Sequence, residues 1–133
     1  MMKSVESFNA LALQVTCHAV NGLSSRKDVS QRMAATIASL AGQIRGSKVF
    51  ISSFSGLKTR LVVLPEYFLT GFPMAESIKI WSEKACIEIN GPEYLALGKI
   101  CQENDIFLSG NAYELDANFP GIYFQVSFII DPS

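Results

Sequence analysis

Histidine and cysteine are scarce in this sequence, which contains one His and three Cys among its 133 residues. Zinc and iron–sulfur sites need several such ligands at short spacings, and Cys17, Cys86 and Cys101 form no CxxC pair. We therefore expect no metal site. Free thiols without paired spacing are typical of a reducing compartment, so we also expect a cytoplasmic location.

Long apolar runs and nucleotide-binding motifs are also missing. No uninterrupted apolar run approaches the roughly 20 residues that a membrane-spanning helix requires, so no membrane partner is expected. The chain has neither a GxGxxG pattern nor a Walker sequence, and no cofactor is expected. Its serines at positions 52, 53 and 55 lack the GxSxG turn of serine hydrolases.

Acidic residues are absent between Val29 and Pro65, although the formal net charge of the chain is only −1. Residues 1–65 carry 8 Lys/Arg and 2 acids, whereas residues 66–133 carry 3 Lys and 10 acids, which gives charges of +6 and −7. The cations are spread out rather than aligned on one helical stripe, so we expect the halves to complement each other and no nucleic-acid partner. Stacking of single-stranded nucleic acid on Phe50 and Phe54 is the alternative.

The composition predicts one folded domain. Hydrophobic residues make up 49% of the chain and charged residues 17%, which is enough for one core, and 133 residues are too few for two ordinary domains. Alternating strand and helix patterns favour an α/β fold. We expect strands at 10–17, 61–64, 106–113 and 122–130, and helices at 28–46, 78–87 and 92–104.

Asp28, with Gln31 three residues later, is predicted to cap the first helix, and Gly46 is predicted to end it. The serine-rich stretch 46–60 is predicted to be a long loop. The short connection at 116–121 should make its flanking strands antiparallel, while the strand–helix–strand order before it implies parallel pairing, so a mixed sheet is expected.

The segment LPEYFLTGFP at 64–73 carries the best candidate for chemistry. Glu66 directly follows an apolar strand, and pockets of α/β sheets lie beyond the carboxyl ends of such strands. Its neighbours in sequence are mostly apolar, and a desolvated carboxylate there can act as a proton acceptor. A structural carboxylate that caps the next turn or pairs with Arg60 is the equally weighted alternative.

Several segments resemble the nitrilase superfamily, the carbon–nitrogen hydrolases. LVVLPEYFLTGFP resembles the segment with the catalytic glutamate, LALQVT the first strand, GPEYLALGKICQENDIFLSGNAYE the following helix and strand, and YFQVSFIIDP the strand that leads to the catalytic lysine. The resemblance covers nearly the whole chain in the family's order. It implies half of a four-layer α-β-β-α sandwich, with a mixed sheet and helices.

The resemblance also implies a Glu-Lys-Cys triad that hydrolyses an amide or a nitrile through a thioester. Glu66 matches the general base, and Tyr67 matches a residue that lines the substrate pocket. The family places its lysine and cysteine beyond the position of Ser133, so residues 1–133 are expected to be a partial domain that precedes both and to be inactive alone. None of the three cysteines replaces the nucleophile, and each is expected to be a core thiol.

The expected partner is a small amide or nitrile, and the full-length form is expected to be a homo-oligomer, as family members usually are. Gln125 stands where the family more often has asparagine, and the stretch 46–60 is longer than the family's usual link. A non-enzymatic α/β binding or regulatory module on the same scaffold is the alternative function.

Overall fold

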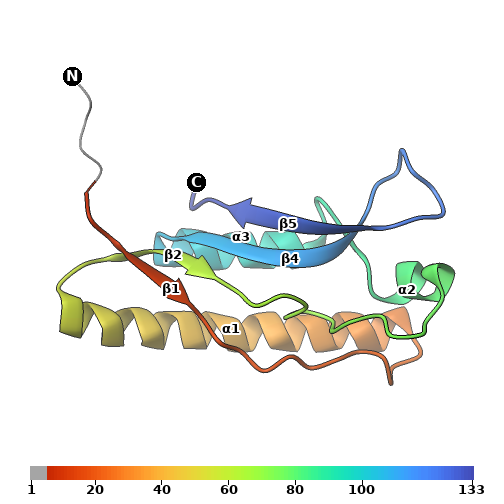
Figure 1. Ribbon diagram of the computed structural model, residues 1–133, viewed down its shortest axis with the longest axis horizontal. Helices are drawn as coiled ribbons and strands as arrows, with labels where there is room; N and C mark the ends of the chain where they lie inside the picture. The colour runs from red at the N-terminus through yellow and green to blue at the C-terminus, as the bar shows by residue number, and fades with distance from the viewer. Residues whose placement is uncertain (1–5) are drawn as a thin grey trace.

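The computed structural model describes residues 6–133, and within them a sheet forms one layer and helices form another (Figure 1). The strands are β1 (Asn9–Ala12), β2 (Thr59–Val63), β3 (Ile87–Glu88), β4 (Phe107–Leu115) and β5 (Phe124–Ile130). The helices are α1 (Arg26–Ser55), α2 (Ile78–Lys84) and α3 (Pro92–Asn104). No helix of residues 6–133 combines the length and apolarity that crossing a membrane requires.

The sheet is mixed, as the sequence predicts. Strands β1 and β2 pair in parallel, and β2 pairs in parallel with the start of β4. The two-residue strand β3 pairs in parallel with the end of β4, and β5 runs antiparallel along the other edge of β4. Strand β4 is therefore the central strand, which pairs with β2, β3 and β5. Its carboxyl end lies beside the start of β5.

Helices α1 and α3 cover one face of the sheet, and most of the opposite face is open. Helices α1 and α3 contact each other, α1 contacts β2, and α3 contacts β4 and β5. On the covered face Val62 and Leu108 are fully buried, whereas Val63, Phe107 and Ile129 on the opposite face are 39%, 45% and 71% exposed. The described residues therefore form two layers of the four that the resemblance implies.

Helix α1 begins one turn earlier than predicted. Ser25, rather than Asp28, is the N-cap: the backbone N–H of Asp28 donates to Ser25 Oγ at 3.1 Å, and Ser25 Oγ donates to the Asp28 carboxylate at 2.7 Å. The predicted buried stripe is confirmed, with Val29, Met33, Ile37, Leu40 and Ile44 all facing the core.

The predicted helix end at Gly46 and the predicted loop over 46–60 are both wrong, because α1 continues to Ser55. One interior glycine costs a helix only about 1 kcal/mol, which a long helix tolerates. The serines remain compatible with the helix because Ser53 and Ser55 donate to the carbonyls four residues earlier, at 2.9 and 3.1 Å. The helix ends at Gly56, whose φ of 67° is the left-handed conformation of a C-cap.

This difference predicts opposite effects for two glycine substitutions. Gly46→Ala should raise the free energy of unfolding by about 0.5–1 kcal/mol, since Gly46 lies inside a helix and nothing lies within 4 Å of an added Cβ. Gly56→Ala should lower it by about 1 kcal/mol, because an L-residue is strained at positive φ. Urea denaturation measures both. Destabilisation by Gly46→Ala would contradict the extended helix.

The remaining boundaries differ less. The first strand is shorter than the predicted 10–17, the helix predicted at 78–87 ends at Lys84, and the brief β3 was not predicted. The helix predicted at 92–104 is confirmed at both ends, and the strands at 106–113 and 122–130 are confirmed to within two residues.

Candidate active site

Glu66 lies just beyond the carboxyl end of β2, where the sequence predicts it, but it is not enclosed. Its apolar neighbours Phe68 and Leu69 point into the core, with 0% and 2% exposure, whereas Glu66 itself is exposed. Tyr67 has a positive φ of 60°, so the chain turns sharply at this point. The expectation of an apolar environment around Glu66 is therefore wrong for residues 6–133.

One polar contact fixes the position of the Glu66 carboxylate. Gln125 Nε2 donates to Glu66 Oε1 at 2.7 Å and lies 3.4 Å from Tyr67 Oη. Gln125 is directly opposite Tyr113 in the β4–β5 pair, so these two side chains lie on the same face of the sheet, the one that α1 and α3 do not cover. An amide that donates to one carboxylate oxygen leaves the other oxygen free to accept a proton.

A cluster of aromatic rings forms a wall beside this carboxylate. The Tyr67 ring is stacked on Tyr113 at 6.0 Å with an interplanar angle of 10°, and it meets Phe72 edge-on at 5.5 Å. Tyr113 also meets Tyr123 and Trp81 edge-on, at 5.5 and 5.7 Å. The wall positions Tyr67, which is half-buried, next to Glu66 and Gln125.

The hydroxyl of Tyr113 stays protonated in this wall. The side chain is 4% exposed, and its hydroxyl has no hydrogen-bond partner among residues 6–133. Burial raises the pKa of Tyr113 well above the ordinary value for a phenol, and the nearby Tyr67, Tyr123 and Glu66 raise it further. Tyr113 is therefore not the proton acceptor of this constellation.

The three thiols lack the properties of a nucleophile. Cys86 and Cys101 are buried core residues, as predicted, and burial raises their pKa to about 12 and about 11. The expectation of a core thiol is wrong for Cys17, which is exposed and donates from Sγ to the Tyr67 carbonyl at 3.0 Å. Desolvation raises the pKa of Cys17 as well, whereas an attacking thiolate needs a lowered pKa.

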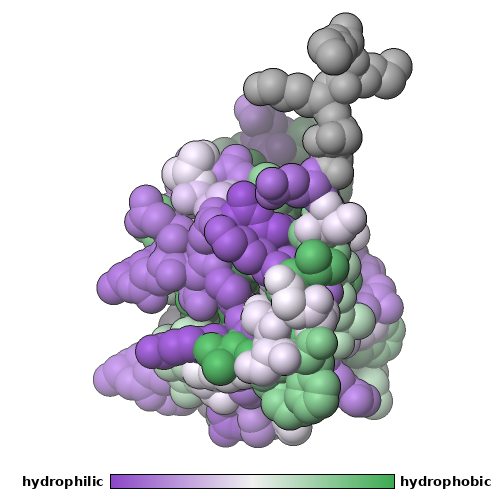
Figure 2. All heavy atoms as spheres, turned by 90° about the vertical axis from the view of Figure 1, so that its left-hand side faces the viewer, coloured by the Kyte–Doolittle hydropathy of each residue, from purple (hydrophilic) through white to green (hydrophobic). Residues whose placement is uncertain are grey.

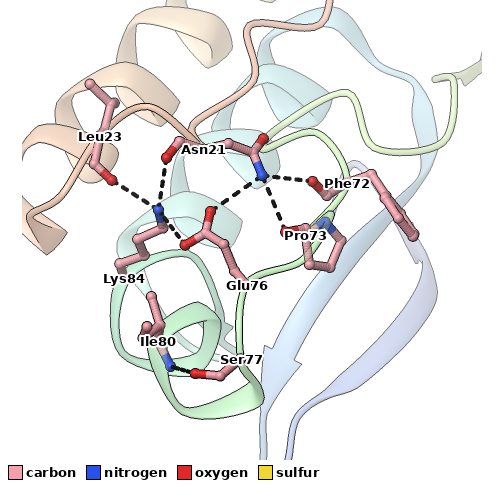
Figure 3. Close-up of polar contacts among 8 residues, drawn as sticks. All are labelled: Asn21, Leu23, Phe72, Pro73, Glu76, Ser77, Ile80 and Lys84. Carbon is pink, nitrogen blue, oxygen red and sulfur yellow. Dashed lines mark hydrogen bonds and ion pairs between the residues drawn. The ribbon is translucent and has the colours of Figure 1, made fainter.

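A buried ion pair holds the segment that follows Glu66 (Figure 3). Lys84 Nζ lies 2.7 Å from Glu76 Oε2 and donates to the carbonyls of Asn21 and Leu23, at 3.2 and 2.9 Å. Asn21 Nδ2 donates in turn to the Phe72 carbonyl at 2.9 Å. These contacts, which we call the Lys84 clamp, join the segment 72–76 to the chain before α1.

No group of three His, Cys, Asp or Glu side chains in the described part of the chain is arranged to hold a metal ion. The site offers a carboxylate that an amide orients beside an aromatic wall. A model of the carbon–nitrogen hydrolase family matches residues 17–133. The chain belongs to the carbon–nitrogen hydrolase family. No curated protein sequence matches it.

The solved structures agree with a nitrilase fold for this carbon–nitrogen hydrolase chain. One similar structure is that of Saccharomyces cerevisiae Nit3, described as a member of branch 10 of the nitrilase superfamily. The match has a TM-score of 0.58 and 20% sequence identity, and it covers 76% of this chain. The chain spans 35% of the length of the Nit3 chain.

The sequence predicts Glu66 and Tyr67 as site residues but does not predict their partners. Gln125 was noted only for its difference from asparagine, and the β4–β5 register brings it to Glu66 from 59 residues away. Tyr113 and the Lys84 clamp were not identified. The alternation of β5 could have indicated Gln125, because its odd-numbered positions are the ones that face away from α1 and α3.

Proposed function

We propose that this chain supplies the general base, Glu66, and one wall of the substrate pocket, including Tyr67, to a hydrolase of amides or nitriles. The observation that carries the proposal is the Glu66 carboxylate, held by Gln125 at the carboxyl end of a parallel strand on the face that α1 and α3 do not cover. The family match over residues 17–133 supports the reaction class.

In the proposed reaction, Glu66 accepts the proton of a cysteine thiol as the sulfur attacks the carbon of the amide or nitrile. A lysine stabilises the negative charge that develops on the substrate. For an amide, the protonated Glu66 then gives the proton to the departing amine, which leaves a thioester. Glu66 next takes a proton from water, which attacks the thioester and releases the acid and the free thiol.

We propose that the lysine and the cysteine come from sequence beyond residue 133, which would complete the sandwich on the open sheet face. Residues 1–133 alone are then a partial domain without hydrolase activity, since the raised pKa of each of the three thiols opposes nucleophilic attack. The full-length form is proposed to be a homo-oligomer, located in the cytoplasm.

The mass of the native protein in cells tests this proposal. Intact-mass spectrometry should find a species well above the 14.6 kDa of residues 1–133, and that species should hydrolyse simple amides or nitriles. A native 14.6 kDa protein that is monomeric, unfolds cooperatively and has no activity would instead support the alternative, a non-enzymatic binding or regulatory module.

Gln125 provides a test of the site geometry. In the active, longer protein Gln125→Leu should lower kcat/KM by about 10- to 100-fold, because a hydrogen bond to a charged group contributes about 1.5–3 kcal/mol. Gln125→Asn should recover part of the loss, and Ser127→Ala, two residues along the same strand face, should have little effect. Steady-state kinetics of the three variants makes the comparison.

The hydrogen bond from Gln125 to Glu66 can also be measured in residues 1–133, where no activity assay is needed. The side-chain amide resonances of Gln125 should shift in Glu66→Ala, which removes the acceptor of the hydrogen bond, and should shift less in Glu66→Gln, whose carbonyl oxygen can still accept it. Identical resonances in the wild type and Glu66→Ala would show that the contact is absent in solution.

A further inference from the structure

The carboxyl-terminal part of α1 extends past the core and exposes aromatic side chains. Ile44 is the last buried residue of the helix, about three turns before its end at Ser55. Beyond it Val49, Phe50 and Phe54 are 66%, 65% and 80% exposed, and the Phe50 and Phe54 rings lie 4.8 Å apart. We call residues 45–58 the α1 tip.

The α1 tip is held in place rather than frayed. Asn9 Nδ2 donates to Ser55 Oγ at 2.7 Å and to the Leu57 carbonyl at 3.0 Å, and Lys48 Nζ donates to the Asn104 carbonyl. The exposed rings are therefore carried by a helix that is already anchored to β1 and to the end of α3. Little conformational entropy would be lost if a partner covered them.

The charge of the α1 tip restricts the partner that can cover it. Arg45, Lys48 and Lys58 lie in this segment, and it contains no acid. Figure 2 views the molecule from this end and shows apolar atoms next to strongly hydrophilic ones. Neighbouring exposed rings, unlike scattered single apolar residues, mark an interaction surface. A complementary surface would be apolar and acidic.

The same chain carries such a surface at the turn between β4 and β5. A hollow of about 500 Å³ there contains the acids Glu88 and Asp116 and no Lys or Arg. Its apolar residues include Ile89 and Phe119, which are 67% and 53% exposed. We call it the hairpin hollow. Its size admits an aromatic side chain, and its charge is opposite to that of the α1 tip.

The α1 tip and the hairpin hollow lie at opposite ends of the longest axis of the molecule, so a chain cannot join its own two surfaces (Figure 1). We infer that the α1 tip of one copy docks into the hairpin hollow of a second copy. Such a contact is heterologous: each copy in a pair keeps one free tip and one free hollow, so growth continues unless a ring closes.

A complementation experiment tests the contact in residues 1–133. The tip variant carries Phe50→Ser and Phe54→Ser, and the hollow variant carries Glu88→Lys and Ile89→Ser, all at exposed positions. Sedimentation velocity should show association of the wild type and at least 10-fold weaker association of each variant alone. A mixture of the two variants should form a 1:1 complex that grows no further, since one intact tip meets one intact hollow. Circular dichroism confirms that both variants fold.

Three results would overturn the inference: a monomeric wild type, undiminished association of either variant alone, or a mixture that forms no complex. Association through the open sheet face would persist in both variants, so undiminished association of a variant would point to that face instead. Loss of binding to a single-stranded oligonucleotide in the tip variant, with self-association unchanged, would assign the α1 tip to nucleic acid instead.

A charge exchange gives a second, independent test. Lys58→Glu and Glu88→Lys should each weaken association, by about threefold at low salt, because each places like charges across the contact. The variant with both changes should associate as the wild type does. Additive weakening in the double variant would contradict the pairing of these two surfaces.

Discussion

Replacement of Glu66 by glutamine is expected to lower kcat by about 10²- to 10⁴-fold in the active, longer protein, the range that a general base contributes. The amide is nearly the same size as the carboxylate, and its carbonyl oxygen can still accept the hydrogen bond that Gln125 donates at 2.7 Å. The site should therefore keep its shape while it loses its proton acceptor. Steady-state kinetics on one amide substrate measures the effect.

Glu83→Gln is the matched control, because Glu83 is an exposed carboxylate on α2 with no ion pair among the described residues. It should leave both kcat and KM unchanged. Unimpaired hydrolysis by Glu66→Gln would show that Glu66 is not the general base. It would favour the structural role that the sequence leaves open for this carboxylate.

The sequence predicts the fold well where one physical signal dominates. The buried stripe from Val29 to Ile44 follows the helical period, Pro92 marks the start of α3, and the alternation in β5 marks a strand with two different faces. Each pattern arises from local geometry, since a side chain's direction follows from its position in its own helix or strand.

The errors arise where distant residues decide the outcome. Serine and glycine between 46 and 55 have weak helical propensity, but contacts from Asn9 and Asn104 hold that part of α1 in place. Local composition around Glu66 suggests burial, yet the turn at Tyr67 directs the apolar side chains inward and the carboxylate outward. The Gln125 contact depends on the register between β4 and β5, which no local pattern specifies.

The Lys84 clamp shows the same dependence on distant residues and has the largest expected effect on stability. Lys84 is 6% exposed, and a buried lysine is tolerated only when its charge and donors are satisfied. Here the Glu76 carboxylate and the carbonyls of Asn21 and Leu23 satisfy them. These partners come from the segments before α1 and after Glu66, so the clamp joins these two segments.

Lys84→Met should lower the free energy of unfolding by about 3 kcal/mol and the Tm by about 10 °C, because it leaves a largely buried carboxylate without its counter-ion and two carbonyls without their donor. Lys79→Met, at an exposed position of the same helix, should change the Tm by about 1–2 °C at most. The double variant Lys84→Met with Glu76→Gln should recover part of the loss, since the unpaired charge is removed. Equal thermal unfolding of Lys84→Met and Lys79→Met would show that the clamp does not stabilise the fold in solution.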